Sequence, residues 1–457
     1  MIDDALHRGE IAVIGLGRSG IAAARLLMRE GGRVYASDAG NSAAVAQAAA
    51  ELRAAGIAVD SGTHDLARIA AATLVVASPG VPPDAPPLSA ARAAGVPVVG
   101  EMEVALLALR GVPYIAITGT NGKSTVTALA AHLLQALGHR AVAAGNIGRA
   151  LSDVALRDER PDWIALEVSS FQLHDTPGLA PVVGVLTNLS PDHLDRYSSV
   201  GAYYADKALL YRNATPASRW VTNADDATAR DLGAGAAGTR WEFSRRLRNA
   251  AAHYDEAGDA LVLFGQPLVP RAALPLLGWH NVENTLAALL AVMVADPAHQ
   301  APAARATLAD AVRSFHGLPH RLEVVADLGG VRWINDSKAT NVTSARVAIE
   351  SMTQPTVVLL GGKHKGEPYT ALVGPLTQHA KLVIAFGEAG PLIAHDLEGR
   401  VPLARGGSSF DEVMHAARAA AGPGDAVLLA PACSSFDMFT NYEARGEAFR
   451  RLAQQLP

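Results

Sequence analysis

Short apolar runs alternate with longer, alanine-rich amphipathic stretches along most of this chain, and this alternation restricts its possible folds more than any other feature. Residues 11–14, 33–36 and 74–77 have the length and composition of buried strands, and residues 19–29 and 43–55 have helical periodicity. Strands separated by helices form parallel sheets that helices cover. The first hundred residues therefore predict an α/β domain with a parallel sheet.

The same alternation occurs twice more. A second block has strand candidates at residues 114–118, 162–167 and 182–187, with helices predicted over 124–138 and 282–295. A third block begins around a predicted turn at residues 317–320. Its strand candidates are residues 332–334, 356–360, 382–386 and 426–429. The chain has 457 residues, and at about 150 residues per domain this length fits three domains.

Two segments depart from the alternation. Residues 81–88 are rich in proline and predict a loop, because proline lacks an amide donor. Residues 240–274 contain shorter runs with more polar alternation, which favours antiparallel strands.

Composition excludes several classes of protein. Apolar residues make up 49% of the chain and the net charge is -5, so the chain is globular and lacks the basic field of a nucleic-acid binder. Its single cysteine, Cys433, cannot form a disulfide within the chain, and a cysteine zinc site is not expected. No apolar stretch reaches the roughly 18 residues of a membrane span, and the acidic start lacks a signal peptide's basic flank. We expect a cytoplasmic protein that neither inserts into membranes nor binds nucleic acid.

The sequence Gly-Leu-Gly-Arg-Ser-Gly at residues 15–20 lies between a predicted strand and a predicted helix. Its glycines allow a tight turn, and the following helix N-terminus favours an anion. Asp38 ends the next predicted strand, where an acidic residue can contact a ribose. The pattern by itself leaves three interpretations open: a dinucleotide such as NAD, another phosphate-bearing nucleotide, or a structural turn.

The sequence Thr-Gly-Thr-Asn-Gly-Lys-Ser-Thr at residues 118–125 again joins a predicted strand to a predicted helix. The amides of such a loop surround phosphate oxygens, Lys123 neutralises their charge, and the hydroxyl of Ser124 or Thr125 can reach Mg²⁺. A strict Walker A motif has glycine at position 117, where this chain has Ile117. The loop is therefore a shortened variant, and its place between strand and helix favours ATP binding over a structural turn.

Acidic and polar residues follow two further strands of the second block. Glu167 ends one predicted strand, and the sequence Ser-Pro-Asp-His-Leu-Asp-Arg at residues 190–196 follows another. Ligands of α/β proteins bind beyond the carboxyl ends of strands, and carboxylates there can hold Mg²⁺. Each feature alone also fits a capping residue or a polar loop, but the phosphate loop in the same block favours a metal site. Without other information, Lys207 would be a helix-surface lysine and Asn281 a structural residue at a helix start.

Three polar segments follow strands of the third block. They are Asn-Asp-Ser-Lys-Ala-Thr-Asn at 335–341, Gly-Gly-Lys-His-Lys-Gly at 361–366 and Ala-Pro-Ala-Cys-Ser-Ser-Phe-Asp at 430–437. Lysines and backbone amides in such loops suit a nucleotide or a carboxylate, although each segment alone also fits a surface turn. Cys433 has no histidine near it in the sequence, so a catalytic thiol is not expected.

Taken in order, these motifs resemble the Mur ligases of peptidoglycan synthesis over essentially the whole chain. The segments that carry the resemblance are residues 118–125, 167–173, 188–196, 280–281, 320–321, 335–341 and 431–446. Within the family the resemblance is strongest to the ligases that add D-glutamate to UDP-N-acetylmuramoyl-L-alanine. The segments that carry this closer resemblance are residues 15–20, 166–173, 192–197, 317–323, 333–341 and 434–442.

The resemblance implies three domains and one reaction. A Rossmann-like UDP-binding domain would cover residues 1–103, a central P-loop ATP-binding domain with a mostly parallel sheet residues 104–317, and a Rossmann-like amino-acid-binding domain residues 318–457. A free carboxylate is a poor acyl donor because its leaving group is oxide. ATP would therefore phosphorylate the alanyl carboxylate, and the amine of D-glutamate would attack the acyl phosphate. Residues 15–20 then become a UDP site, and no NAD is implied.

By matched position, the resemblance also implies roles for individual residues. Lys207 matches a lysine that is carbamylated in the family, which would turn a cation into an anion. The implied catalytic residues are Lys123, His193 and Lys207. The implied ligands of two Mg²⁺ ions are Ser124, Thr125, Glu167, His193 and Lys207. The implied ATP contacts are Gly119, Thr120, Asn121, Gly122, Lys123, Ser124, Thr125, Asn281, Arg321 and Asp336.

Two small-molecule substrates are implied as partners, and the protein is expected to be a monomer. The implied contacts of the UDP-muramoyl substrate are Gly17, Arg18, Ser19, Asp38, Ser78, Gly80, Asn146, Gln172 and His193. The implied contacts of D-glutamate are Thr340, Lys365, Ser435, Phe436 and Tyr442. Phe436 and Tyr442 stand where some relatives have Leu and Phe, so the pocket shape can differ, and Lys363 stays open as an alternative to Lys365.

Three other functions stay open on the sequence alone. The first is a Mur-type ligase for a different amino acid, including L-glutamate. The second is an NAD-dependent oxidoreductase built on residues 15–20, against which the phosphate loop at 118–125 already counts. The third is a nucleotide-regulated binding protein without catalysis.

Overall fold

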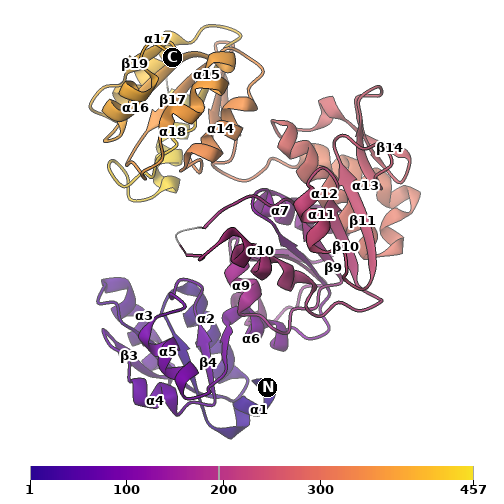
Figure 1. Cartoon of the computed structure of the whole chain (residues 1–457), viewed down its shortest axis with the longest axis vertical. Helices are drawn as coiled ribbons and strands as arrows, with labels where there is room; N and C mark the ends of the chain where they lie inside the picture. The colour runs from indigo at the N-terminus through magenta and orange to yellow at the C-terminus, as the bar shows by residue number, and fades with distance from the viewer. Residues whose placement is uncertain (1, 194–195, 456–457) are drawn as a thin grey trace. The chain divides into compact units, whose positions relative to one another are not determined.

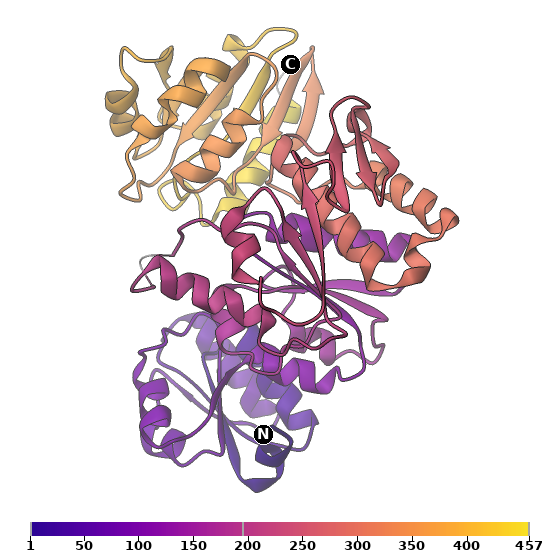
Figure 2. The same ribbon diagram turned by 45° about the vertical axis from the view of Figure 1, so that its right-hand side comes forward.

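The computed structural model describes residues 2–193 and 196–455, and these residues form three β-sheets with helices packed against them (Figures 1 and 2). The α/β class and the mostly parallel sheets predicted from the alternation of strands and helices are confirmed. Leu194 and Asp195, which belong to the predicted motif at 190–196, lie outside the described residues.

The first sheet has five parallel strands in the order β3-β2-β1-β4-β5 and is the indigo part of Figure 1. Its strands are β1 (Glu10–Ile14), β2 (Arg33–Asp38), β3 (Ala58–Ser61), β4 (Leu74–Ala77) and β5 (Val98–Gly100). Its helices are α1 (Ile2–Arg8), α2 (Arg18–Arg29), α3 (Ala43–Ala54), α4 (Leu66–Ala70), α5 (Pro86–Ala93) and α6 (Glu101–Ala108).

Both faces of this sheet are buried. Ile11 and Val13 of β1 pack in the cluster that contains residues of α2 and α3, whereas Ala12 and Ile14 pack with residues of α4 and α5. Successive side chains of a strand point to opposite faces, so a strand between two helical layers is apolar throughout. The predicted loop over residues 81–88 is wrong at its end, because α5 begins at Pro86, and proline suits a first helical turn whose amide needs no intrahelical acceptor.

The second sheet has nine strands in the order β14-β13-β12-β11-β10-β9-β6-β8-β7. The strands are β6 (Tyr114–Thr118), β7 (Ala141–Gly145), β8 (Trp163–Glu167), β9 (Val183–Leu186), β10 (Arg219–Asn223), β11 (Thr239–Ser244), β12 (Ala252–Asp255), β13 (Ala260–Leu263) and β14 (Gln266–Pro270). Antiparallel pairing is confirmed for β12, β13 and β14, but β11 pairs in parallel with both neighbours. Strand β6 pairs in parallel with both β8 and β9, so the carboxyl ends of these three strands lie side by side at the same edge of the sheet.

Seven α-helices belong to this part of the described chain. They are α7 (Lys123–Ala136), α8 (Leu151–Ala155), α9 (Ser170–His174), α10 (Val200–Ala208), α11 (Ala227–Leu232), α12 (Trp279–Ala295) and α13 (Pro302–Ser314). Short 3-10 turns are η1 (Leu209–Tyr211), η2 (Arg271–Ala273) and η3 (Pro297–Gln300).

The third sheet has six strands in the order β15-β16-β20-β17-β18-β19, parallel except for the β15–β16 pair. Its strands are β15 (Glu323–Leu328), β16 (Val331–Asn335), β17 (Thr356–Gly361), β18 (Ala380–Phe386), β19 (Leu403–Arg405) and β20 (Ala426–Leu429). Its helices are α14 (Val342–Glu350), η4 (Tyr369–Leu372), α15 (Val373–His379), α16 (Gly390–Leu397), α17 (Phe410–Ala420) and α18 (Tyr442–Gln455). Residues of α14, α15 and α16 share one apolar cluster with the sheet, and residues of α17 and α18 share another.

The chain divides into two compact units. The first runs to Arg271 and resumes over Glu283–Arg313, and the second comprises Ala272–Val282 and the residues from Ser314 onward. One apolar cluster joins the first two sheets, since it includes Ile11 of β1, Ala116 of β6 and Ile164 of β8. The boundaries at 103/104 and 317/318 stay predictions. In the described part of the chain, no helix combines the length and hydropathy needed to cross a membrane.

Candidate active site

The loop at residues 118–125 joins the buried strand β6 to helix α7, as predicted. Gly119 has φ 141° and Gly122 has φ 85°, in the region that disfavours side chains. A Cβ at Gly122 would lie 2.2 Å from Asn284 Oδ1, and a Cβ at Gly119 would lie 2.0 Å from Thr187 Oγ1. Both glycines are therefore required by backbone conformation and by space, which explains this part of the motif.

Segments far away in the sequence brace this loop. Asn188 accepts from the Thr120 amide at 2.9 Å through its backbone oxygen, and its side-chain oxygen accepts from the Asn121 amide at 2.9 Å. Thr187 Oγ1 donates to Asn121 O at 2.6 Å. The Lys123 ammonium donates to Gly119 O at 3.1 Å and to Thr120 O at 2.8 Å, so it curls over the loop. Thr187 and Asn188 follow the neighbouring strand β9. Asn188 begins the segment 188–196 that carries the family resemblance, but the sequence did not assign either residue a role at this loop.

Lys207 is buried next to this loop, with 1% of its surface exposed. Its Nζ donates to Thr118 Oγ1 at 2.9 Å and lies 5.5 Å from the centre of the Tyr203 ring. Burial lowers the pKa of Lys207 well below its usual range, and the nearby Lys123 charge lowers it further. The interpretation of Lys207 as an ordinary helix-surface lysine is therefore wrong. A neutral amine is the form that reacts with carbon dioxide, so this environment suits carbamylation.

Glu167 ends β8, and its backbone is in register with Ile117 of β6, next to the loop. It is 1% exposed, and its Oε1 accepts from Asn146 Nδ2 at 2.9 Å. Its Oε2 is buried and has no hydrogen-bond partner. A buried carboxylate oxygen without a donor is costly unless a cation or a donor approaches it. This oxygen is suited to a divalent cation or to one of its water ligands.

His193 follows β9 and is the most exposed of the predicted catalytic residues. It has φ 54°, and its ring lies 5.3 Å from that of Phe171 and 6.2 Å from that of Tyr203. The described residues contain no group of three or more His, Cys, Asp or Glu side chains arranged to hold a metal ion. A magnesium site at Glu167 would therefore depend on hydroxyl groups, water, nucleotide oxygens or a carbamate for its other ligands.

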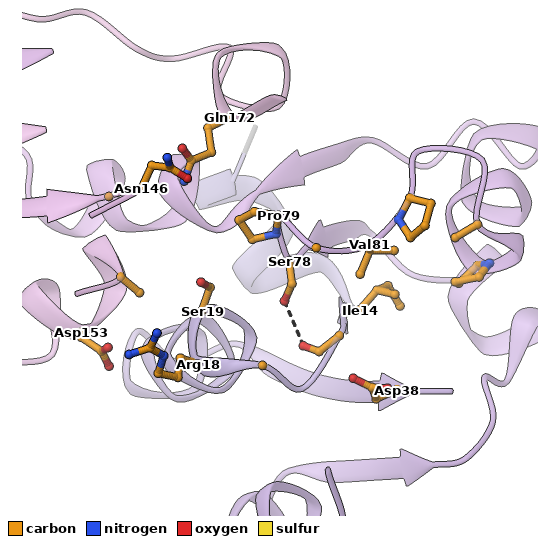
Figure 3. A pocket seen from close by; sticks show the side chains of 18 of the residues that line it. Ile14, Arg18, Ser19, Asp38, Ser78, Pro79, Val81, Asn146, Asp153 and Gln172 are labelled. Atoms are coloured by element: carbon orange, nitrogen blue, oxygen red, sulfur yellow. Dashed lines mark hydrogen bonds between the residues drawn. The ribbon is translucent and has the colours of Figure 1, made fainter. Parts of the chain in front are cut away.

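A cavity of about 710 Å³ lies at the carboxyl edge of the first sheet (Figure 3). Its walls come from the loops after β1, β2 and β4 and from the segment between β7 and α8. The predicted UDP-substrate residues that line it are Gly17, Arg18, Ser19, Asp38, Ser78, Gly80, Asn146 and Gln172. His193 is not among the lining residues. The start of α2, which has no side-chain cap, also lines this cavity, and such a helix start suits an anion.

Asp38 and Ser78 shape this cavity through backbone contacts. Asp38 Oδ2 accepts from the Leu16 amide at 2.7 Å, and its Oδ1 accepts from the Gly40 amide at 2.7 Å. Ser78 Oγ donates to Gly15 O at 3.0 Å, the dashed line in Figure 3. Asp38 thus holds the glycine loop in place, a role that the sequence pattern alone did not suggest.

The cavity also contains charged groups that the motifs did not identify. Arg149 and Asp153 line it, and Figure 3 shows Asp153 facing Arg18. Burial raises the pKa of Asp153, while the charges of Arg149, Arg18 and Arg25 oppose this rise. Two guanidinium groups at one end of a cavity suit a ligand with phosphate groups. No local motif pointed to Arg149 or Asp153, because both follow β7, a strand that the sequence did not predict.

The second compact unit contains the other predicted ATP residues. Asn281 is buried at the start of α12, and its Nδ2 donates to Leu277 O at 2.7 Å. Asp336 follows β16 and accepts from the Leu322 amide at 3.2 Å. Removal from water raises the pKa of Asp336 to about 7, against the opposing charge of Arg321. Burial, together with the same Arg321 charge, lowers the pKa of His280 to about 4. The Arg321 charge therefore acts on both Asp336 and His280.

Of the predicted amino-acid residues, Thr340, Lys365, Ser435 and Phe436 lie on loops that follow strands of the third sheet, and Tyr442 begins helix α18. Lys365 Nζ donates to Thr340 Oγ1 at 3.4 Å. Lys363 forms a backbone bridge with Ser434, which joins the loop that carries Lys365 to the loop that carries Ser435. The Tyr442 hydroxyl accepts from Lys338 Nζ at 3.0 Å. Lys338 was not among the predicted contacts.

Phe436 and Cys433 differ in burial although both follow β20. Phe436 is 68% exposed, so its ring is free to meet a ligand or a neighbouring surface. Cys433 is buried and its Sγ lies 2.9 Å from Tyr369 OH. Burial raises the pKa of Cys433 to about 11, so the thiol stays protonated at neutral pH.

Family models match most of the chain in three consecutive segments. They are a Mur ligase MurD-like N-terminal domain at residues 9–100, a Mur ligase middle domain at 117–292 and a Mur ligase glutamate ligase domain at 320–433. The chain is 41% identical to the UDP-N-acetylmuramoylalanine–D-glutamate ligase of Acidobacterium capsulatum, over 97% of this chain and 95% of that protein. It is 40% identical to the enzyme of the same name from Myxococcus xanthus, over 99% of each chain.

Solved structures share the fold at lower identity. The UDP-N-acetylmuramate-alanine ligase MurC of Thermotoga maritima matches with a TM-score of 0.60 and 20% identity, over 98% of this chain and 100% of that one. A pseudomurein peptide ligase type C of Methanothermus fervidus matches with a TM-score of 0.56 and 18% identity, over 98% and 100%.

Proposed function

The chain belongs to the Mur ligase family, and on this premise we propose that it is an ATP-dependent ligase that joins D-glutamate to UDP-N-acetylmuramoyl-L-alanine during peptidoglycan precursor synthesis. The main structural support is the buried, unpartnered Oε2 of Glu167, which ends the strand next to the glycine loop of residues 118–125. A phosphate loop with an acidic side chain on the adjacent strand is the arrangement that phosphoryl transfer requires.

The first cavity binds the UDP end of the muramoyl substrate. The uncapped start of α2 and the side chain of Arg18 meet the diphosphate, while Asp38 and Ser78 hold the glycine loop that surrounds it. Asn146 and Gln172 line the same cavity on its other side (Figure 3) and meet the muramoyl end. The proposed contacts are Gly17, Arg18, Ser19, Asp38, Ser78, Gly80, Asn146, Gln172 and His193.

The loop at residues 118–125 binds the ATP phosphates. Lys123 exchanges its two carbonyl partners for phosphate oxygens and neutralises charge that develops as the phosphoryl group moves to the alanyl carboxylate. The acyl phosphate is then open to the amine of D-glutamate, because phosphate is a far better leaving group than oxide. The proposed ATP contacts are residues 119–125 with Asn281, Arg321 and Asp336.

The residues around Glu167 fit magnesium. The free buried oxygen of Glu167 and a hydroxyl of Ser124 or Thr125 would hold one ion, and His193 with a carbamylated Lys207 would hold a second. Magnesium, when bound, supplies positive charge to the phosphoryl oxygens. In its cationic form Lys207 would repel a metal, and even as a neutral amine it lacks the oxygen ligands that Mg²⁺ prefers, so the second site requires the carbamate.

The loops of the third sheet bind the amino acid. Lys365 is exposed on its loop and meets a carboxylate of D-glutamate, with Thr340, Ser435, Phe436 and Tyr442 as the other proposed contacts. One domain is proposed for each ligand, over residues 1–103, 104–317 and 318–457. We further propose that the protein works as a monomer in the cytoplasm. Light scattering of the purified protein measures its molar mass in solution and so tests whether it is a monomer.

A coupled phosphate-release assay tests the function. Purified protein with ATP and Mg²⁺ should release phosphate only when both UDP-N-acetylmuramoyl-L-alanine and D-glutamate are present, and mass spectrometry should find their condensation product. L-glutamate, L-lysine and meso-diaminopimelate should give no product. Turnover with one of these and none with D-glutamate would assign the chain to a different ligase activity. Binding of NADH without any ligase turnover would support an oxidoreductase.

A further inference from the structure

Arg445 is a fully buried arginine on α18, with 0% of its surface exposed. All five of its N–H groups have acceptors. Its Nε donates to Ser337 Oγ at 3.0 Å, and its two terminal nitrogens donate to four backbone oxygens. Those oxygens belong to Ser337, Gly361, Cys433 and Ser434. A guanidinium with every donor satisfied at fixed positions is a rigid connector.

These acceptors lie on three different loops. Ser337 follows β16, Gly361 ends β17, and the pair Cys433–Ser434 follows β20. The strands β16, β20 and β17 are neighbours in the third sheet, so Arg445 joins the carboxyl ends of its three central strands. The same three loops carry the proposed amino-acid contacts Thr340, Lys365 and Ser435.

The helix that carries Arg445 is itself fixed to the sheet. Ser337 Oγ donates to Tyr442 O at 2.8 Å, and Asn335 Nδ2 donates to Gly446 O at 3.2 Å. Both contacts flank Arg445 within the first turns of α18. The helix therefore fixes the position of the guanidinium, and the guanidinium in turn fixes the positions of the three loops.

Arg445 makes no ion pair with any residue in the described part of the chain, so four carbonyl dipoles and the Ser337 hydroxyl solvate its charge. Asp437 is near enough for its charge to act on the guanidinium, but the Arg445 donors bond to other acceptors. Asp437 Oδ2 accepts from the Glu388 amide at 3.0 Å, and its buried Oδ1 has no hydrogen-bond partner. An arginine buried without a paired carboxylate is expensive to keep. Its bonds to three loops explain why such a group is tolerated here.

We propose that Arg445 is the positioning residue of the amino-acid pocket: its five-donor fork holds the loops that carry Thr340, Lys365 and Ser435 in the geometry that binds D-glutamate. Lysine has the charge but only three donors, all on one nitrogen, so it leaves at least two of the five acceptors without a donor and lacks the planar fork that spans the three loops. The inference rests on the proposed function of these loops. Arg445 touches no substrate in this arrangement and acts through the loop residues.

Two variants and a control test this role. Arg445→Lys keeps the charge and loses the fork. Ser337→Ala removes only the oxygen that joins Arg445 Nε to Tyr442 O. Arg450→Lys is the matched control, because Arg450 lies on the same helix and pairs instead with Glu323 and Glu447. The KM values for D-glutamate, ATP and UDP-N-acetylmuramoyl-L-alanine, kcat and the melting temperature are measured for each.

We expect Arg445→Lys to raise the KM for D-glutamate by about tenfold or more, and Ser337→Ala by about threefold, with the other two KM values within about twofold of wild type. Arg450→Lys should leave all three unchanged. A lower melting temperature with unchanged KM for D-glutamate, or an equal rise of all three KM values, would reduce Arg445 to a stabilising residue and overturn the proposal. If Arg445→Lys does not fold, Ser337→Ala decides by the same criterion. Wild-type protein that is inactive with D-glutamate would reject the proposed function. Active wild-type protein, with variants whose KM for D-glutamate is unchanged, would reject only this inference.

Discussion

Two glycine-rich loops in the first compact unit follow the same plan and are stabilised in different ways. Residues 15–17 join β1 to α2, and residues 119–122 join β6 to α7. The first loop is held by side chains from other strands, Asp38 and Ser78. The second is held by its own Lys123 as well as by Asn188 from the neighbouring strand end.

The difference decides how each loop meets an anion. The first loop and the start of α2 line a cavity of about 710 Å³, so its binding surface exists before the ligand arrives. In the second loop the Lys123 ammonium bonds to loop carbonyls, and it must exchange these partners to meet a phosphate. Under the proposed function, similar sequence motifs thus produce one preformed site and one site that rearranges. The following predictions separate the two.

Lys123→Ala should have the largest effect. Loss of the ammonium removes the main protein charge on the transferring phosphoryl group, and we expect kcat to fall by about 10³-fold or more. Binding of UDP-N-acetylmuramoyl-L-alanine, measured by calorimetry without ATP, should stay within about twofold of wild type. A comparable loss of affinity for this substrate would show that the two loops do not act separately.

Glu167→Gln should have the next largest effect. Glutamine can still accept from Asn146 but offers no negative charge to a cation, so we expect kcat to fall by about 10²-fold and the Mg²⁺ concentration for half-maximal rate to rise. Glu103→Gln is the matched control, since Glu103 accepts from the Gly178 amide in the same unit and faces neither loop. A Glu167→Gln enzyme with an unchanged magnesium requirement would contradict the assignment.

Asp38→Asn should affect only the first loop. Asparagine has one acceptor oxygen where Asp38 uses two, so either Leu16 or Gly40 loses its partner. We expect the KM for the UDP-muramoyl substrate to rise by about tenfold, with the KM for ATP unchanged. Asp60→Asn on the adjacent strand β3 is the control, because Asp60 bonds to Tyr35 OH and does not line the cavity. An equal effect of both variants would mean a general loss of stability.

The smallest expected effect is a pH dependence of the first site. Burial raises the pKa of Asp153 above the ordinary 3.8, so acidification protonates this carboxyl earlier than an exposed one. Protonation removes a negative charge beside a diphosphate, and the KM for the UDP-muramoyl substrate should fall by about twofold as the pH is lowered from 7.5 through the pKa of Asp153. Asp153→Asn should bind with the low-pH affinity throughout. A KM that rises on acidification in wild type would reverse the predicted sign.

Much of the fold followed from local pattern. The glycine loops at residues 15–20 and 118–125 were placed correctly between strand and helix, since glycine spacing and apolar runs are local features. The parallel pairing of β11 and the helical start at Pro86 were not predicted, because pairing partners and helix starts depend on packing. Strand β7 was also missed, because its sequence Ala-Val-Ala-Ala-Gly has only one β-branched residue and so gives a weak strand signal.

The candidate site divides in a similar way. Motifs pointed to Lys123 and Glu167, and the family resemblance pointed to Lys207. The sequence could not show that Lys207 is buried or that one oxygen of Glu167 lacks a donor, because both depend on neighbouring strands and helices. Arg445 gave no motif signal on its own, since its five acceptors come from three separate loops.

The sequence by itself determined an α/β chain with two phosphate-type loops and three blocks of alternating strand and helix. Hydrophobic periodicity and glycine spacing are patterns over a few neighbouring residues, so they can be recognised in the sequence without the fold. The tertiary structure decided which strand ends became neighbours. That choice set the burial of Lys207, the open oxygen of Glu167 and the three loops joined by Arg445, because burial and unmet hydrogen bonds are properties of assembled surfaces.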